Sequence, residues 1–362
     1  MLEKETVDLD SPAVYPRLDP QAMRTHLLDF PRLCRQAWQM ALEFALPADY
    51  SEVNKIVVLG MGGSAIGGDL VSALALDEAR APVLVCRDYN LPRYVDGETL
   101  VIASSYSGMT EETLSAFQQA IERGAKNLAI TTGGRLKSLC QSRGVPAFIF
   151  DYRSQPRAAF PFSFLAILGI LHNLGLLRVG PDKAKEAFSS LEKVSAKINE
   201  EVPLAQNPAK SLARKLQGRL PVIYGAGLTA EVAHRWKTQF NENSKTMAFY
   251  EVFPELGHNA IVGYSLPPEI TGQSMVILLD SDLLPGRVRL RYDITRQLLE
   301  RAGLYYQTLK GEGQVALSQV LTQVLLGDYV SYYLGILNQV DPTPVKPITF
   351  LKDRLASGDA LP

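Results

Sequence analysis

Short runs of consecutive apolar residues alternate with longer amphipathic segments along most of the chain. A first set of runs, which we expect to be strands, covers residues 55–60, 82–87, 99–104, 126–131 and 146–150. A second set begins at Val222 and continues at residues 247–252, 274–279 and 304–309. Strands that alternate with helices form parallel sheets covered on both faces, and their crossovers are right-handed. The pattern therefore predicts an α/β protein with two doubly wound parallel-sheet sandwich domains.

The segments around these two sets divide the chain into three parts. Residues 1–50 show helical spacing and predict an N-terminal helical arm that Pro31 interrupts. Residues 51–180 hold the first sheet. Residues 181–362 are expected to form the second domain, with charged helices over 181–217 and a helical C-terminal tail. Val222–Thr229 repeats the strand-to-glycine transition of Val57–Ser64, which indicates an internal duplication by architecture.

The most informative motif is the glycine cluster Gly60-Met-Gly-Gly-Ser64, which follows the first apolar run and precedes a helical segment. Glycines allow a ligand to approach the backbone closely, and the free N–H groups of a helix start attract an anion. Gly62, Gly63 and Ser64 are therefore candidate phosphate ligands. The spacing Gly60-x-Gly62-x-x-Ala65 also fits a dinucleotide fingerprint, with Asp88 as a possible ribose ligand.

A hydroxyl-rich loop follows the third run, where Ser105, Ser107 and Thr110 surround Gly108 just before a helix expected over 111–123. Hydroxyl donors beside helix N-terminal N–H groups suit the dianion of a phosphate monoester. A simpler interpretation is that Thr110 only caps the helix. Two such loops at neighbouring strand ends favour phosphate binding, and a dinucleotide site would leave the hydroxyl cluster without a task.

Three further motifs lie downstream, namely Gln155-Pro-Arg-Ala-Ala159, Asn241-Glu-Asn-Ser-Lys245 and Phe253-Pro-Glu-Leu-Gly-His-Asn259. Together with the two loops, they resemble the bifunctional phosphoglucose/phosphomannose isomerases, whose sugar isomerase (SIS) domains bind phosphosugars. The resemblance runs from about residue 55 to the C-terminal end. One position departs from it, because Met109 stands where the family usually has an Asn.

The resemblance implies an aldose–ketose isomerase that interconverts glucose 6-phosphate and mannose 6-phosphate with fructose 6-phosphate through a cis-enediol. Such a reaction needs a base, a ring-opening acid–base group and positive charge near the enediolate. By resemblance, Glu242 is the base and His258 acts at the ring. Arg157 is expected to stabilise the enediolate or to hold a substrate hydroxyl, since a guanidinium suits either task. Lys352 resembles the family's C-terminal lysine, with Lys346 as a competing candidate.

Composition narrows the classes of partner. The formal net charge is −1 and basic clusters are absent from the sequence, so we expect no nucleic-acid partner. Cys34, Cys86 and Cys140 lack metal-ligand spacing and are expected to be reduced thiols. The N-terminal residues are acidic and polar, which predicts no signal peptide and a cytoplasmic protein. The apolar stretch 160–177 is expected to be a buried helix rather than a membrane span.

The sequence predicts neither a metal nor a cofactor, because proton transfer by acid–base groups needs none. His26, His172 and His234 lie in helical segments and are expected to be structural. The resemblance implies a homodimer in which His258 reaches the neighbouring subunit's site, with apolar surface supplied by residues 160–177 and the N-terminal arm. The alternative is a non-catalytic phosphosugar-binding protein or regulator of the same fold.

Overall fold

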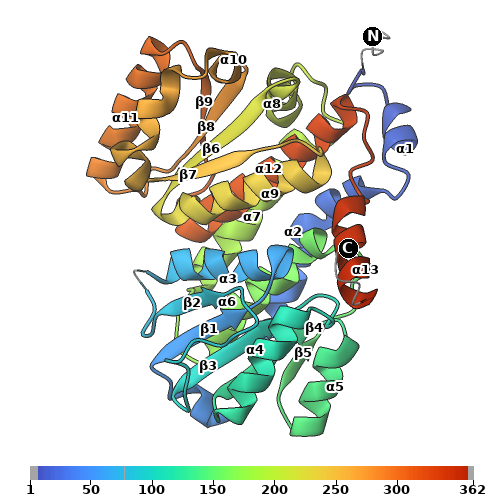
Figure 1. The fold of residues 1–362 in the computed structure, drawn as a ribbon, viewed down its shortest axis with the longest axis vertical. Coiled ribbons are helices and arrows are strands. Elements are labelled where there is room, and N and C mark those ends of the chain that lie inside the picture. The colour runs from blue at the N-terminus through green and yellow to red at the C-terminus, as the bar shows by residue number, and fades with distance from the viewer. Residues whose placement is uncertain (1–6, 77, 358–362) are drawn as a thin grey trace.

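The molecule contains two parallel β-sheets, one in each half, and each sheet has helices on both faces (Figure 1). The computed structural model describes residues 7–76 and 78–357. The first sheet has the order β2-β1-β3-β4-β5, and the second has the order β7-β6-β8-β9. All of the neighbouring strands are parallel. The predicted α/β class with two doubly wound sandwiches is therefore confirmed.

The strands lie close to the predicted runs. Those of the first sheet are β1 (Lys55–Leu59), β2 (Val83–Cys86), β3 (Thr99–Ser104), β4 (Lys126–Thr131) and β5 (Ala147–Ile149). Those of the second sheet are β6 (Leu220–Ala226), β7 (Phe249–Phe253), β8 (Ser274–Asp280) and β9 (Tyr305–Lys310).

Helices fill the intervals between the strands. In the first half these are α1 (Val14–Leu18), α2 (Met23–Leu42), α3 (Gly62–Ala75), α4 (Glu111–Glu122), α5 (Gly134–Arg143) and α6 (Phe160–Asn173). The second half contains α7 (Pro181–Ile198), α8 (Pro208–Leu216), α9 (Ala230–Asn243), α10 (Pro268–Thr271), α11 (Gly286–Arg301), α12 (Ala316–Leu337) and α13 (Lys346–Ser357). Short 3₁₀ turns are η1 (Ala48–Ser51), η2 (Pro156–Ala159), η3 (Gly227–Thr229), η4 (Glu255–His258) and η5 (Ala260–Ser265).

Alternate residues of the strands face different cores. In β1, Ile56 and Val58 join the large central core, while Val57 and Leu59 pack with residues of α4 and α5. The same alternation in β8 sends Ile277 to the central core and the neighbouring residues toward α11. This period of two is what a strand buried on both faces requires.

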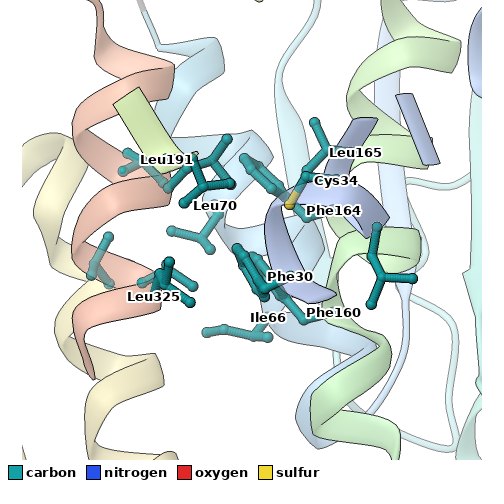
Figure 2. Packing of buried hydrophobic residues seen from close by; sticks show 14 of the residues in the cluster. Phe30, Cys34, Ile66, Leu70, Phe160, Phe164, Leu165, Leu191 and Leu325 are labelled. Atoms are coloured by element: carbon teal, nitrogen blue, oxygen red, sulfur yellow. The ribbon is translucent and has the colours of Figure 1, made fainter. Parts of the chain in front are cut away.

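The central core lies between the two sheets and joins the two halves. Helix α2 packs on α6, α3 also packs on α6, and α12 packs on α7, α8 and α9. Figure 2 shows Phe30 of α2, Phe160 and Phe164 of α6, and Leu325 of α12 meeting in this core. The prediction that Pro31 interrupts the arm is wrong, because α2 continues through Pro31 from Met23 to Leu42.

Candidate active site

The two candidate phosphate loops lie side by side, because β1 and β3 are adjacent and Leu59 is in register with Ala103. Gly62 has a φ of +49°, which glycine adopts readily and which turns the chain into α3. The Ser64 hydroxyl accepts a hydrogen bond from the backbone N–H of Tyr106 in the second loop, at 3.2 Å. The two loops are thus joined at the carboxyl edge of the sheet, where doubly wound proteins bind ligands.

The hydroxyl groups of the second loop face one another rather than serving only as helix caps. The hydroxyls of Ser105 and Thr110 lie 3.0 Å apart, and the Ser107 hydroxyl accepts the Met109 N–H at 3.2 Å. Thr110 occupies the N-cap position of α4, but its side chain makes no capping hydrogen bond. The cap interpretation therefore does not explain this hydroxyl. The side chain of Met109 is exposed, and its sulfur accepts the Arg135 N–H.

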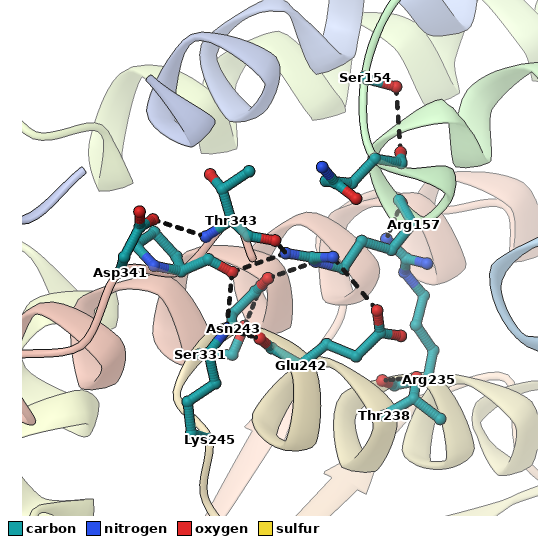
Figure 3. A network of polar contacts seen from close by, with 12 residues as sticks. Ser154, Arg157, Arg235, Thr238, Glu242, Asn243, Lys245, Ser331, Asp341 and Thr343 are labelled. Carbon is teal, nitrogen blue, oxygen red and sulfur yellow. Dashed lines mark hydrogen bonds and ion pairs between the residues drawn. The ribbon is translucent and has the colours of Figure 1, made fainter. Parts of the chain in front are cut away.

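Arg157 joins the first half of the chain to the second. Its guanidinium, which is 2% exposed, donates from Nε to the Asn243 side-chain oxygen at 2.7 Å and from Nη1 to Glu242 Oε2 at 3.2 Å. Nη2 donates to the carbonyl oxygens of Pro342 and Thr343 at 2.6 and 3.0 Å. Figure 3 shows Arg157 at the centre of this network, with Glu242 and Asn243 on the last turn of α9.

The backbone of Arg157 packs directly against the glycine cluster. A Cβ placed on Gly63 would lie 3.1 Å from both the N and the Cα of Arg157, so only glycine allows this approach without a shift. Behind it, Arg235 donates to the Arg157 carbonyl at 3.2 Å and forms a buried ion pair with Asp328 at 2.6 Å. The arginine is thus held between the glycine loop and the end of α9.

Burial lowers the pKa of Arg157, and the Glu242 carboxylate opposes this effect. The ion pair places a cation beside a carboxylate that is 24% exposed and therefore accessible to a small substrate. Carboxylate and guanidinium together can remove a carbon-bound proton and stabilise the resulting anion. The structure therefore brings together the candidates Arg157, Glu242 and Gly63, which are far apart in the sequence.

Lys245 is a polar residue of the site that the sequence did not single out. Its ammonium donates to the Glu242 carbonyl at 2.5 Å and to the Pro342 carbonyl at 3.0 Å, and its φ is +55°. Burial, followed by the nearby charge of Arg157, lowers its pKa to about 8. A lysine in the Asn-Glu-Asn-Ser-Lys motif offered a signal, but only the fold shows that it closes the end of α9.

His258, Lys346 and Lys352 are not joined to Glu242 or Arg157 in a single chain. His258 ends η4 beyond β7, and its exposed side chain makes no hydrogen bond or ion pair among the described residues. Both lysines are exposed on α13. Lys346 lines a cavity of about 440 Å³ together with Gln155, next to the turn that carries Arg157, and Lys352 is not in its lining.

One group of side chains has the composition of a metal site, although the sequence predicted none. Ligand atoms of Asp69 on α3 and of Glu231 and His234 on α9 lie within 4.8 Å of one another. Asp69 is paired with Arg87, and the His234 ring lies 3.1 Å from Glu231. The acidic groups thus already have partners, and the group lies away from Glu242, at the other end of α9.

Two apolar helices, α6 and α12, were compared with the features of a membrane-spanning helix. The predicted buried helix is confirmed as α6, whose residues from Phe160 to Leu171 are buried. Among the described residues, one helix, α12, is long and apolar enough to cross a bilayer, but 94% of its apolar window is buried inside the protein. The three cysteines are free, as expected.

The fold and the site define the class of protein. Two doubly wound sheets, with a glycine loop and a hydroxyl loop at adjacent strand ends, form a double SIS-type α/β protein. Residues 205–355 match the family model for the bacterial phospho-glucose isomerase C-terminal SIS domain. A solved structure of a hypothetical protein from Thermus thermophilus has a TM-score of 0.75 at 16% identity, and the match covers 96% of this chain and 93% of that one.

Curated relatives give the family. A bifunctional phosphoglucose/phosphomannose isomerase from Caldicellulosiruptor bescii is 42% identical over 329 residues, 91% of this chain and 97% of the relative. The protein of the same name from Aquifex aeolicus is 38% identical over 308 residues, 85% of this chain and 92% of the relative. The chain belongs to the bifunctional phosphoglucose/phosphomannose isomerase family.

Proposed function

We propose that this protein interconverts glucose 6-phosphate and mannose 6-phosphate with fructose 6-phosphate. The observation that carries the proposal is the contact chain from the glycine loop through Arg157 to Glu242. It places a carboxylate and a cation next to a loop suited to phosphate. The names of the curated relatives support the same substrates.

The phosphate is held by the two loops of the first sheet. The backbone of Gly62 and Gly63 and the hydroxyl of Ser64 contribute from the start of α3, and three further hydroxyls contribute from the loop before α4, those of Ser105, Ser107 and Thr110. Both helices direct their positive N-terminal ends at the same edge of the sheet, which favours a dianion.

Glu242 takes the proton from C2 of the open-chain aldose, which leaves a cis-enediol, and returns it to C1 to give the ketose. Arg157 stabilises the negative charge that develops on the enediolate oxygens. Glucose 6-phosphate and mannose 6-phosphate differ only at C2, and the enediol has no stereocentre there. One base and one pocket can therefore serve both aldoses.

Ring opening requires a further acid–base group, and we assign it to His258. An imidazole can both donate and accept a proton, which suits this step. Lys352 remains the proposed C-terminal lysine of the site, and Lys346 is the competing candidate because it lies nearer to Gln155 in the single chain.

Because His258 is remote from the Arg157 network within one chain, the proposal includes a homodimer with shared sites. The predicted source of dimer surface, the apolar stretch 160–177, is wrong: α6 is already covered within one chain by α2 and α3. Exposed apolar side chains instead follow His258, where Val262 is 83% exposed and Leu266 is 74% exposed. This surface would bring His258 to a second subunit.

Mixed dimers test the shared site. Inactive His258→Ala subunits exchanged with inactive Glu242→Gln subunits should recover about a quarter to a half of the activity, because a mixed dimer of this symmetry re-forms one intact site. Lack of recovery after verified subunit exchange would show that each site lies within one chain.

The catalytic proposal itself is tested by a coupled assay with each aldose phosphate in the presence of a chelator. We expect turnover of both aldoses with the chelator present, since the proposed enzyme is cytoplasmic and works without a metal. Tight binding of the sugar phosphates with no turnover would favour the alternative, a non-catalytic phosphosugar-binding protein. Loss of turnover on chelation, restored by a divalent cation, would contradict metal independence.

A further inference from the structure

The second sheet contains an equivalent of the phosphate site. Strands β7-β6-β8-β9 repeat the order β2-β1-β3-β4, so the loops after β6 and β8 correspond to those after β1 and β3. Gly227 has a φ of +49°, the same value as Gly62, and Thr229 stands two residues later, as Ser64 does. The backbone of a ligand loop is therefore present at the point where the strand order reverses.

A cavity of about 530 Å³ lies at this position, and we call it the second switch-point cavity. One wall consists of the loops after β6 and β8, with Gly227, Leu228, Leu283 and Leu284. The opposite wall comes from the first half of the chain, with Leu168 and Leu177. A volume of several hundred Å³ lined mainly by apolar side chains is typical of small-molecule sites.

The side chains of this cavity do not suit a phosphate monoester. Leu228 occupies the position of Gly63 and removes the open approach to the backbone. The hydroxyl of Thr229 is buried, accepts the Ala226 N–H at 2.9 Å and donates to the Leu279 carbonyl at 2.8 Å. The proton of the Thr229 hydroxyl is therefore committed to the protein. Among the described residues, the equivalent Ser64 hydroxyl only accepts a hydrogen bond, from the Tyr106 N–H, and keeps its own proton for a ligand. The ligand must be largely apolar.

The charged residues that line the cavity indicate the charge of the ligand. Arg178, Lys183 and Glu78 line the cavity, and Lys183 and Glu78 neutralise one another at 2.7 Å. Arg178 is exposed and has no ion-pair partner among the described residues. The starts of α11 and α12 also border the cavity through Pro285 and Ala316, and helix N-termini favour negative charge. The positive charge of Arg178 is therefore available to pair with a negatively charged group of a ligand.

We propose that the second switch-point cavity binds a small carboxylate with an apolar body, whose chain packs against the leucines and whose carboxylate pairs with Arg178. This site is separate from the proposed isomerase site. Helix α9 begins at Ala230, directly after the η3 turn that borders the cavity, and ends at Asn243, next to Glu242. A helix of 14 residues separates its two ends by about 21 Å. The binding site therefore does not depend on the catalytic proposal.

Calorimetric titration with decanoate, below its micellar concentration, tests this assignment on the full chain. We expect saturable binding to the unmodified protein and much weaker binding of decanol, which lacks the charge. Ala316→Phe fills the cavity from the start of α12 and should weaken decanoate binding at least ~10-fold, because a packed interior leaves no room for both. Ala196→Phe, on the exposed face of α7, is the matched control and should bind normally.

Arg178→Gln provides an independent test, because an exposed side chain can be changed without disturbing the core. We expect decanoate to bind this variant about as weakly as decanol binds the unmodified protein, while Arg143→Gln on α5 leaves binding unchanged. Absence of decanoate binding to the unmodified protein would overturn the proposal. Equal binding by Ala316→Phe would place the ligand elsewhere, and equal binding by Arg178→Gln would refute the role of the charge.

Discussion

The loops after β1 and β3 and the loops after β6 and β8 occupy equivalent places in two sheets of the same strand order. The elements that follow β1 and β6, α3 and η3, both start at a glycine with a φ of +49°, so the backbone turn is common to both. The first set then presents Gly63 and hydroxyl groups, whereas the second presents Leu228 and further leucines. The comparison shows that equal strand order places loops at equivalent edges of the two sheets, while the side chains on those loops differ in chemistry.

The second half contributes to the proposed chemistry through a helix end rather than through its strand ends. Helix α9 leaves the second switch point and carries Glu242 and Asn243 to Arg157, at the edge of the first sheet. A domain without a hydroxyl cluster at its own strand ends can thus still supply groups to the candidate site of its neighbour. Four predictions test this division of roles.

The largest effect is expected at Glu242. Glu242→Gln keeps the shape and the hydrogen bond to Arg157 but removes the proton acceptor, so kcat should fall at least ~100-fold, the low end for a general base. Steady-state assays with both aldoses should show the same loss, because one enediol serves both. Glu231→Gln, at the other end of α9, is the control and should keep its activity. Different losses for the two sugars would disprove a single shared base.

The second largest effect is expected at Ser107, in the hydroxyl loop after β3. In the proposed phosphate site, Ser107→Ala removes one hydrogen bond to a charged group, which is worth about 1.5–3 kcal/mol, so KM should rise roughly 10- to 150-fold with kcat nearly unchanged. Substrate titration of the initial rate measures both constants. A KM equal to that of the unmodified protein would remove Ser107 from the phosphate site.

The corresponding change in the second sheet should act on stability alone. Thr229→Val leaves the buried N–H of Ala226 without its acceptor and should lower the free energy of unfolding by about 1–3 kcal/mol. Urea unfolding measures this loss, and KM should stay constant in the variant. A raised KM with unaltered stability would mean that the second loop also contacts the substrate.

The smallest effect is the pH dependence attributed to Lys245. Its pKa is lowered from 10.5 to about 8 in the folded chain, mainly by burial. Between these two values the unfolded chain binds a proton that the folded chain has released, so this group stabilises the folded state increasingly as pH rises through the window. The penalty for the buried charge is fully present below about pH 8.

Urea midpoints of the unmodified protein and of Lys245→Met, measured at about pH 7 and about pH 10, isolate this contribution. The difference between the two midpoints should move in favour of the unmodified protein at the higher pH. Lys193→Met, on an exposed face of α7, should show no such movement. A midpoint difference independent of pH would show that the folded Lys245 titrates as the unfolded one does.

Most of the fold could be predicted from the sequence, because each buried parallel strand is a short run of consecutive apolar residues. The runs at 99–104 and 126–131 match β3 and β4 to the residue, and the other strands differ by one or two residues at their ends. The arm was less predictable. Pro31 suggested a break, but packing of α2 on α6 keeps the helix continuous. The packing of α2 therefore outweighs the tendency of proline to interrupt a helix.

The candidate site was predicted unevenly. The phosphate loops follow their strands directly, so sequence order alone places Ser64 and Ser105 at one edge. Glu242 and Arg157 were predicted as site residues from their motifs. They are 85 residues apart in the chain, and no local pattern indicates that the carboxylate and the guanidinium form an ion pair. Lys245 was not predicted as a site residue, because it donates its hydrogen bonds to backbone carbonyls. Such bonds do not depend on the partner's residue type and leave no pattern in the sequence.

The sequence by itself determined the two sheets, their parallel character and the position of the glycine and hydroxyl loops, since these depend on periodicity and on glycines at strand ends. Only the tertiary structure decided that α6 is covered within one chain, that Arg157 is buried against Gly63, and that a leucine-lined cavity lies at the corresponding strand ends of the second sheet. The physical reason is that burial and ion pairing depend on segments distant in the chain, and a local pattern records only its own neighbours.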